Sequence, residues 1–235
     1  MANWYIGMTE AAIRQKVADT ALALVGIKEG TAEHKKIIDT YNAKLPKLPR
    51  GYKMTYDDAW CACTMSYIGI VLEIIDVILP ECSCSAMIGL YKKAGRWEER
   101  DDYVPDIGDL VMYAWKGQKG ENTLAPDHVG MVVSVEGKTI RVLEGNYDNQ
   151  VKIREICVEY IKVRGYCLPD YASLVQGFSD VDPGAWYAKD VAWGAEHGIV
   201  EGIGDGLFEP DRPITRAEVV AMLHRYDTVK NQLDK

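Results

Sequence analysis

Hydrophobic residues recur with a helical period through the first third of the chain. The stretch 9–25 opens with Thr9 as a candidate N-cap and stops at Gly26. Asp57 and Asp58 offer N-cap chemistry to a later apolar run. The pattern therefore predicts further helices over residues 31–45, 59–74 and 85–94.

After Pro105 the hydrophobic pattern changes to one typical of strands. Strands are predicted over residues 110–115, 128–135, 139–145, 150–155 and 163–168. Glu136, Gly137 and Lys138 form a tight hairpin connection between the second and third of them. Helices followed by an antiparallel sheet predict an α+β fold.

A short polar connector, residues 169–177, separates the region 1–168 from a compact helix-loop-helix at 178–235. The first helix of this small domain carries an apolar stripe of Trp186, Val191, Ala195 and Ile199. The second begins at Thr215 and carries Val219, Val220, Leu223 and Tyr226. About 50 residues make a marginal independent fold, so we expect this domain to bury apolar residues against something else.

Composition narrows the functional classes. The 235 residues have a net charge of −8 and show no basic cluster, which argues against nucleic acid as the main partner. The most apolar run, 68–79, carries Glu73 and Asp76 and is too short to span a membrane. The start of the chain lacks a basic segment followed by an apolar one, so we expect synthesis in the cytoplasm without a signal peptide.

Six cysteines occur, at positions 61, 63, 82, 84, 157 and 167. Without a signal peptide, free thiols are expected rather than a disulfide framework. The two Cys-x-Cys pairs suggest a zinc site. However, if Cys61 opens a helix, Cys61 and Cys63 point roughly 200° apart around it and do not easily share one metal. We therefore expect no metal and no cofactor.

Three pieces of acyl-transfer chemistry follow one another in the sequence. Cys61 lies at a predicted helix start, where a thiol tends towards thiolate character. His128 begins the most apolar strand and is a candidate general base. Glu144 or Asn146, on one face of the next strand, could accept the imidazole N–H and fix its tautomer.

Each piece also has a structural interpretation. Cys61 could simply pack beside Trp60, His128 could be a hydrogen-bonded core residue, and the residues after Glu144 are rich in turn formers. The other histidine of this region, His34, lies in a polar helical stretch and is expected at the surface.

Together these motifs resemble the CHAP domain, over about residues 9–168. The resemblance rests on Trp60-Cys61-Ala62, Gly108-Asp109-Leu110, Asp127-His128-Val129-Gly130, Glu144-Gly145-Asn146 and Val163-Arg164-Gly165-Tyr166. It implies a papain-like fold and a cysteine- and histidine-dependent amidase or peptidase that cuts amide bonds in peptidoglycan. It assigns Cys61 as nucleophile, His128 as base and Glu144 as orienting residue, with Asn146 as a further polar site residue.

Two details of this site remain expectations. The backbone N–H of Cys61 and one further donor, for which Tyr56 is a candidate, would stabilise the oxyanion. Some CHAP domains bind calcium through acidic residues before the nucleophile. Only Asp57 and Asp58 stand there in this chain, so calcium is not predicted.

The C-terminal region resembles one S-layer homology (SLH) motif, from Phe178 to Tyr226. The matching residues are Phe178-Ser179-Asp180-Val181, Trp186, Gly198-Ile199-Val200-Glu201-Gly202, Gly206-Leu207-Phe208-Glu209-Pro210 and Ile214-Thr215-Arg216-Ala217-Glu218. Thr215 and Glu218 form a capping box, whereas Arg216 beside helix-start N–H groups suits an anionic ligand. The resemblance implies binding of anionic secondary cell-wall polysaccharide, with Arg216, Thr215, Glu218, Trp186 and Asp180 as the binding residues.

SLH motifs usually occur as three, and here there is one. We therefore expect chains to associate into homo-oligomers through this domain; the alternative is a degenerate module that packs on the catalytic domain. The whole chain is best interpreted as an endolysin-like N-acetylmuramoyl-L-alanine amidase or peptidoglycan endopeptidase that acts at the Gram-positive cell wall. A papain-like acyltransferase and a non-catalytic wall-anchoring protein are the alternatives.

Overall fold

The chain folds into two compact units. The computed structural model describes residues 4–5, 7–100, 102–116, 124–175, 177–182, 184–204 and 206–233, with the backbone alone for 231–233. One unit comprises residues 14–170. The other combines the described residues up to Ile13 with those from Tyr171 onward. The division falls inside the first helix at one end and at Tyr171 at the other, where the predicted connector contains the short 3₁₀ turn η2 (Tyr171–Leu174).

The helices predicted for the first part of the chain are present. They are α1 (Glu10–Leu22), α2 (Ala32–Lys44), α3 (Cys61–Val71) and α4 (Cys84–Lys93), with the 3₁₀ turn η1 (Pro49–Gly51) between α2 and α3. Thr9 caps α1 by accepting a hydrogen bond from the backbone N–H of Ala12 at 3.0 Å. Thr31 caps α2 in the same way, through the N–H of His34 at 3.3 Å.

In the described part of the chain, a six-stranded antiparallel sheet follows the helices, and its strands do not lie in the order of the sequence. Its strands are β1 (Trp97–Glu98), β2 (Leu110–Tyr113), β3 (His128–Glu136), β4 (Thr139–Glu144), β5 (Lys152–Cys157) and β6 (Val163–Cys167), in the spatial order β1-β6-β2-β3-β4-β5. The predicted α+β fold is thus confirmed. Strand β1 was not predicted, because two residues are too few to show a period. The hairpin turn is as expected, with Gly137 at φ +60° between the paired residues Glu136 and Thr139.

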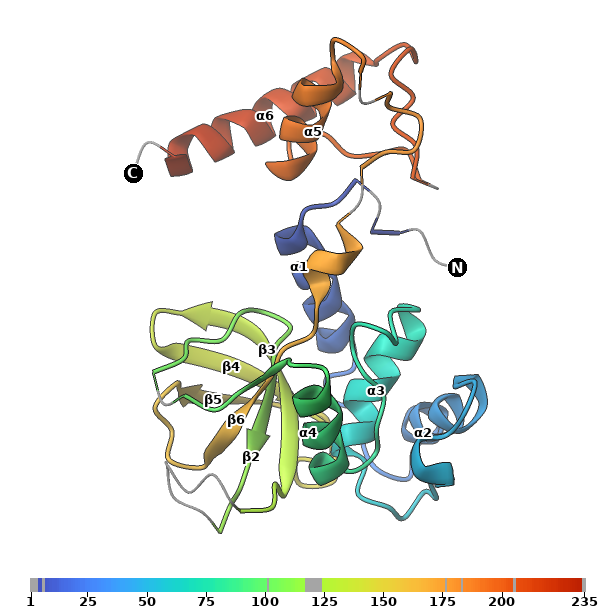
Figure 1. Ribbon diagram of the computed structural model, residues 1–235, viewed down its shortest axis with the longest axis vertical. Coiled ribbons are helices and arrows are strands. Elements are labelled where there is room, and N and C mark those ends of the chain that lie inside the picture. Colours follow the sequence, from blue (N-terminus) through green and yellow to red (C-terminus); the bar gives the residue numbers. More distant parts are fainter. Residues whose placement is uncertain are drawn as a thin grey trace. The chain divides into compact units, whose positions relative to one another are not determined.

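Helix α3 is the centre of the larger unit. Every residue from Cys61 to Ile70 is buried, as expected of a helix that is apolar all round. It packs against α2 and against strand β3, so that it lies between α2 and the sheet (Figure 1). Because α3 packs on β3, Cys61 at the start of α3 lies near His128 at the start of β3, and the candidate site forms there.

The predicted capping of α3 by Asp57 or Asp58 is wrong. Its N-cap is Trp60, whose side chain makes no capping hydrogen bond. The carboxylate of Asp58 instead accepts hydrogen bonds from the backbone N–H of Thr55 at 2.7 Å and from the hydroxyl of Tyr52. Asp58 therefore closes the preceding loop, and the helix begins later than expected, at Cys61.

The smaller unit contains α5 (Ala188–Glu196) and α6 (Arg216–Leu233). Val191 and Ile199 are buried, as the apolar stripe predicts, but Trp186 is 88% exposed and does not join it. On α6 the apolar residues are also outside a core: Val219, Val220, Leu223 and Tyr226 are between 38% and 66% exposed. Within the described residues this unit therefore leaves an apolar helix face uncovered.

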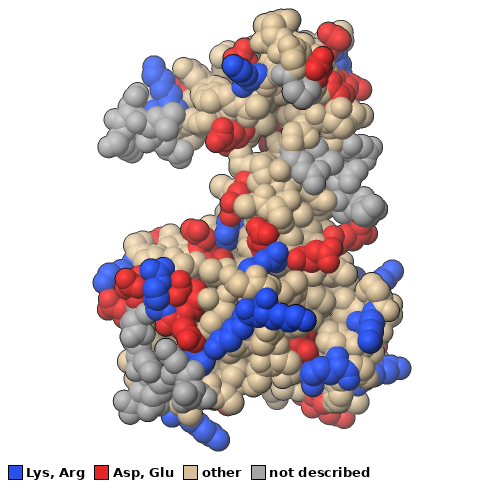
Figure 2. Space-filling view, viewed as in Figure 1, with Lys and Arg blue, Asp and Glu red and all other residues tan. Residues whose placement is uncertain are grey.

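In the face that Figure 2 shows, the unit 14–170 carries both basic and acidic side chains. Among the helices described, none reaches the length and apolarity that crossing a bilayer requires.

Candidate active site

Cys61 is positioned by the residue before it. Trp60 is fully buried, its indole N–H donates to Glu29 at 3.1 Å, and its ring packs on that of His34 at 4.7 Å. Burying an indole of this size contributes roughly 4–6 kcal/mol. This anchor fixes the start of α3, and Cys61, 6% exposed, is the first helical residue. Its sulfur therefore lies at a helix N-terminus, where unpaired N–H groups favour an anion.

His34 corrects a second expectation. It is completely buried rather than at the surface, and its Nδ1 accepts a hydrogen bond from the N–H of Gly30 at 3.2 Å. Burial lowers the pKa of His34. The charged neighbours Glu33 and Lys35 are exposed, so the stretch is amphipathic and its histidine occupies the inner face.

His128 and Glu144 meet on adjacent strands. His128 is the first residue of β3, Glu144 is the last of β4, and the ring Nε2 lies 3.1 Å from a carboxylate oxygen of Glu144. The backbone partner of Glu144 in the sheet is Gly130. A Cβ at Gly130 would lie only 2.7 Å from Cγ of Glu144. The glycine two residues after the histidine therefore makes room for the carboxylate that contacts the ring.

Arg154 completes this arrangement and was not predicted. It donates to both carboxylate oxygens of Glu144, at 2.7 and 3.0 Å, and its guanidinium lies 4.0 Å from the ring centre of Tyr147. Glu144 is completely buried, and a buried carboxylate requires a paired cation. Arg154 could have been found only from the register of β5. Lys152 pairs with Glu144, and Arg154 lies two residues further on, on the same face of the sheet.

The electrostatics of the site follow from these contacts. Burial disfavours a charged ring, but hydrogen bonds and charges from Cys61 and Glu144 outweigh it and raise the pKa of His128 to about 9. The pKa of Cys61 is well below its usual range, because hydrogen bonds from Cys84 and His128 outweigh burial. The pKa of Glu144 is lowered: burial acts against ionisation, and the bonds to His128 and Arg154 overcome it. Both shifts act in the direction that favours a thiolate on Cys61 and an imidazolium on His128.

Cys84 is a second residue that sequence reasoning missed at this site. It is the first residue of α4, and its sulfur lies 3.7 Å from that of Cys61. The remaining cysteines do not form disulfides; all six are free thiols in the structure. Among the described residues, no three His, Cys, Asp or Glu side chains gather in a geometry that could hold a metal ion.

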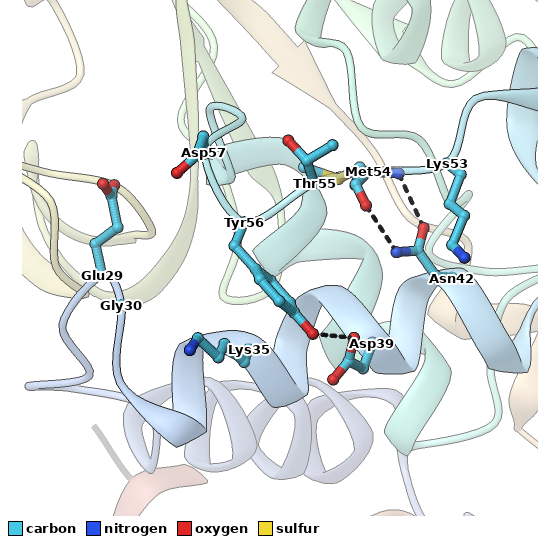
Figure 3. Close-up of a pocket in the computed structure, with 10 residues that line it drawn as sticks. All are labelled: Glu29, Gly30, Lys35, Asp39, Asn42, Lys53, Met54, Thr55, Tyr56 and Asp57. Carbon is cyan, nitrogen blue, oxygen red and sulfur yellow. Dashed lines mark hydrogen bonds between the residues drawn. The ribbon is translucent and has the colours of Figure 1, made fainter.

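The structure separates Asn146 and Tyr56 from these contacts. Strand β4 ends at Glu144, and Asn146 lies in the following turn at φ +55°, so the two do not share a strand face. Of the two predicted acceptors, Glu144 is the one bonded to the ring. The hydroxyl of Tyr56 donates to Asp39 on α2 at 2.9 Å, as Figure 3 shows.

Tyr56 instead lines a polar cavity of about 680 Å³ beside the loop that leads to Trp60. The loop is held to α2 by Asn42, whose side chain makes two hydrogen bonds of 2.9 Å with the backbone of Met54 (Figure 3). Charged side chains of both signs line the cavity: Glu29, Lys35, Asp39, Lys53 and Asp57. Neither Cys61 nor His128 belongs to this lining, so the cavity does not contain the thiol.

Gly108 and Asp109, part of the CHAP-like pattern, have a structural role. The side chain of Asp109 is 1% exposed and accepts hydrogen bonds from Arg14 at 3.1 Å and from the hydroxyl of Tyr103 at 2.7 Å. These contacts hold the loop before β2 on α1. This motif therefore supports the scaffold of the site rather than its chemistry.

The polymer-binding candidates of the smaller unit fall into two groups. Thr215 and Glu218 form the predicted capping box, with backbone-to-side-chain bonds of 2.7 and 3.2 Å. The carboxylate of Asp180 accepts from the N–H groups of Phe208 and Glu209 at 2.9 and 2.7 Å, and so ties two loops together. Arg216 and Trp186 are exposed.

Comparison with known proteins supports both resemblances. The CHAP domain model matches residues 51–146, and the S-layer homology domain model matches residues 177–220. The solved structure described as "The crystal structure of Ly7917" is 15% identical, with a TM-score of 0.34. The match covers 66% of this chain and 62% of that one. No curated protein matches this chain.

The first family model spans the loop before Cys61, then Cys61, His128 and Glu144, and the second spans α5 and the start of α6. A CHAP domain implies cysteine- and histidine-dependent amidase or peptidase activity on peptidoglycan, and an SLH domain implies association with the cell wall. The chain therefore carries a CHAP domain followed by an S-layer homology domain.

Proposed function

We propose that this chain is an endolysin-like peptidoglycan hydrolase that cleaves an amide bond through a thioester on Cys61. The observation that carries the proposal is the chain of contacts from the Cys61 thiol to His128 and from His128 Nε2 to Glu144. Because Nε2 faces Glu144, the other ring nitrogen is left to exchange a proton with the sulfur. This is the arrangement that nucleophilic catalysis by a thiol requires.

The steps follow from these positions. The thiolate of Cys61 attacks the scissile carbonyl, and the backbone N–H of Cys61 at the helix start stabilises the oxyanion. The imidazolium of His128 then protonates the leaving amine, which leaves a thioester. Neutral His128 next takes a proton from water, and the hydroxide equivalent releases the acyl group. Glu144 stays ionised and holds the ring in the productive tautomer, while Arg154 holds Glu144.

The test is the lysis of purified Gram-positive walls. We expect Cys61→Ala and His128→Ala each to abolish the loss of turbidity while circular dichroism shows an intact fold. Cys157→Ala is the matched control, since Cys157 is exposed at the end of β5 and should lyse like the parent. Full lytic activity in purified Cys61→Ala would disprove the assignment.

Two alternatives are separated by further measurements. A papain-like acyltransferase would pass the acyl group to an amine, so mass spectrometry of soluble wall fragments would show a new amide rather than a free carboxylate. A non-catalytic wall-anchoring protein would label with iodoacetamide no faster at Cys61 than at the other thiols. The same fragments identify the bond cut, as an amidase leaves free L-alanine termini and an endopeptidase cuts within the peptides.

We further propose that the SLH unit holds the enzyme at the wall by binding anionic secondary cell-wall polysaccharide. Exposed Arg216 at the start of α6 supports this, because a cation beside helix-start N–H groups suits an anion. The uncovered apolar residues of α6 support association of chains through this unit. A molar mass in light scattering that rises with concentration is expected. A constant monomer mass would contradict the association.

A further inference from the structure

Two cysteine sulfurs meet at the candidate active site. Cys61 Sγ and Cys84 Sγ are 3.7 Å apart, although 23 positions separate the two residues in sequence. Each is the first residue of its helix, Cys61 of α3 and Cys84 of α4. The N-termini of two helices therefore converge on this sulfur pair, and both favour negative charge there. The proposed mechanism gives no role to Cys84.

The two sulfurs differ in protonation. The hydrogen bond between them is the largest cause of the lowered pKa of Cys61, and the same bond, with burial, raises the pKa of Cys84. One proton is thus shared unequally: Cys61 is the thiolate and Cys84 keeps the S–H. A low-pKa thiolate with a second thiol next to it is the arrangement found in cysteines that oxidise reversibly.

The other four cysteines are poor competitors. Cys82 is only partly exposed, and burial raises the pKa of its thiol. Cys63 and Cys167 are completely buried, and burial raises the pKa of each thiol, so both stay protonated. Cys157 is exposed but lies on the far strand β5. The gap between the sulfurs of Cys61 and Cys84 needs to close only to the length of a disulfide, about 2 Å.

We propose that Cys84 is a resolving thiol, which forms a reversible disulfide with Cys61 when the protein meets a peroxide. The Cys61 thiolate attacks one peroxide oxygen, the O–O bond breaks, and a sulfenic acid forms while hydroxide leaves. The sulfur of Cys84 then attacks the sulfur of Cys61, and an S–S bond replaces the S–O bond. The proton of Cys84 and the departing hydroxide leave as water. Two thiols lose two electrons, and the peroxide is reduced to water.

This disulfide regulates the proposed hydrolase, and in that respect the inference rests on the proposed function. It removes the nucleophile from catalysis and protects it, because a sulfenic acid without a nearby thiol proceeds to the irreversible sulfinic acid. A thiol reductant would restore the enzyme. The oxidised form is therefore a storage form that exposure to a reducing environment activates.

The experiment treats the reduced full-length chain with hydrogen peroxide. Intact mass should fall by two hydrogen atoms, and a non-reducing peptide map should show one cross-linked product that contains Cys61 and Cys84. Wall lysis should disappear together with the thiols and return fully with dithiothreitol.

Cys84→Ser separates protection from simple oxidation. After the same treatment Cys61 in this variant should gain two oxygen atoms as a sulfinic acid, and dithiothreitol should not restore the variant's own starting activity. Cys157→Ser is the matched control and should behave like the parent. Peroxide that leaves Cys84 reduced in the parent, or a disulfide from Cys61 to another cysteine, would overturn the inference. Formation of the Cys61–Cys84 peptide in a chain that lyses no wall would instead refute the proposed function alone.

Discussion

His128 presents its Nε2 to Glu144 at 3.1 Å, and both residues lie at the ends of adjacent antiparallel strands. Since the carboxylate is completely buried and accepts from this nitrogen, it fixes which nitrogen carries the hydrogen. The same contact also stabilises the charged ring. This ion pair therefore orients the base and, together with Cys61, raises the pKa of its ring.

The first prediction concerns the alkaline limit of activity. The pKa of His128 is raised from 6.5 to about 9, so the thiolate–imidazolium pair persists up to about pH 9 and is lost above it. We expect kcat/KM for wall lysis to fall through that range. Glu144→Gln removes a charge that favours imidazolium, so the alkaline limb of the variant's pH profile should move towards lower pH. Each unit of movement lowers the rate about tenfold at pH values above both limbs.

The charged form of His128 also stabilises the fold, and this stabilisation is lost in the same direction of pH as the activity. The folded-state pKa of His128 is above its unfolded value, so the stabilisation from its charged form is fully present below about pH 6.5 and is lost as the pH rises through about 9.

Glu155→Gln is the control for the pH profile of Glu144→Gln, because it removes a carboxylate from the exposed side of β5. An alkaline limb that is identical in Glu144→Gln and in the parent would contradict the role of Glu144.

The second prediction concerns Arg154. Arg154→Met leaves a completely buried carboxylate without its two strongest donors. We expect the free energy of unfolding, measured in urea at neutral pH, to fall by about 1.5–3 kcal/mol. The double variant Glu144→Gln, Arg154→Met should lose less than the sum of the single variants, because removing both charges leaves no unpaired ion.

Lys138→Met provides the comparison for Arg154. It also removes a cation from an ion pair, but the pair with Glu159 is exposed to solvent and should contribute little. If Arg154→Met lowered the free energy of unfolding no more than Lys138→Met, the buried ion pair between Arg154 and Glu144 would contribute no more to stability than an exposed one.

The third prediction concerns Gly130. A Cβ in Gly130→Ala would lie 2.6 Å from Cγ1 of Val142 and 2.7 Å from both Cγ of Glu144 and the backbone oxygen of Leu143, so strand β4 and the Glu144 side chain must shift together. We expect this shift to displace the carboxylate from His128. We expect kcat to drop by at least about tenfold, the effect of a misplaced catalytic group, with a smaller change in KM. Gly89→Ala is the control: a Cβ there meets nothing within 4 Å, and alanine in helix α4 should stabilise by about 1 kcal/mol.

The sequence predicted those residues of the site whose positions follow from local hydrophobic periodicity. Cys61 at a helix start and His128 on a strand follow from periodicity, and the structure places both as expected. Glu144 could not be separated from Asn146, because their two-residue spacing looks like one strand face. The choice depends on where β4 ends, and a positive φ at Asn146 is not visible in the pattern.

The residues that sequence reasoning missed are those whose role depends on tertiary contacts. Arg154 is recognised only through the register of β5 against β4. Cys84 is recognised only once α4 is placed beside α3. His34 looked exposed since its neighbours are charged, and Asp58 looked like a helix cap because capping and loop closure use the same side-chain chemistry.

The last prediction separates structural from binding residues in the SLH unit. Both Asp180 and Arg216 belong to the motif, but the carboxylate of Asp180 is occupied by the N–H groups of Phe208 and Glu209. Asp180→Ala should therefore lower the thermal unfolding midpoint of this unit and weaken wall binding only as a consequence. Arg216→Gln should keep the midpoint and reduce co-sedimentation with walls that retain their anionic polysaccharide. Walls stripped of that polymer should bind the parent and Arg216→Gln equally poorly. Equal retention of Arg216→Gln and the parent on intact walls would show that the cation at the start of α6 does not contact the polymer.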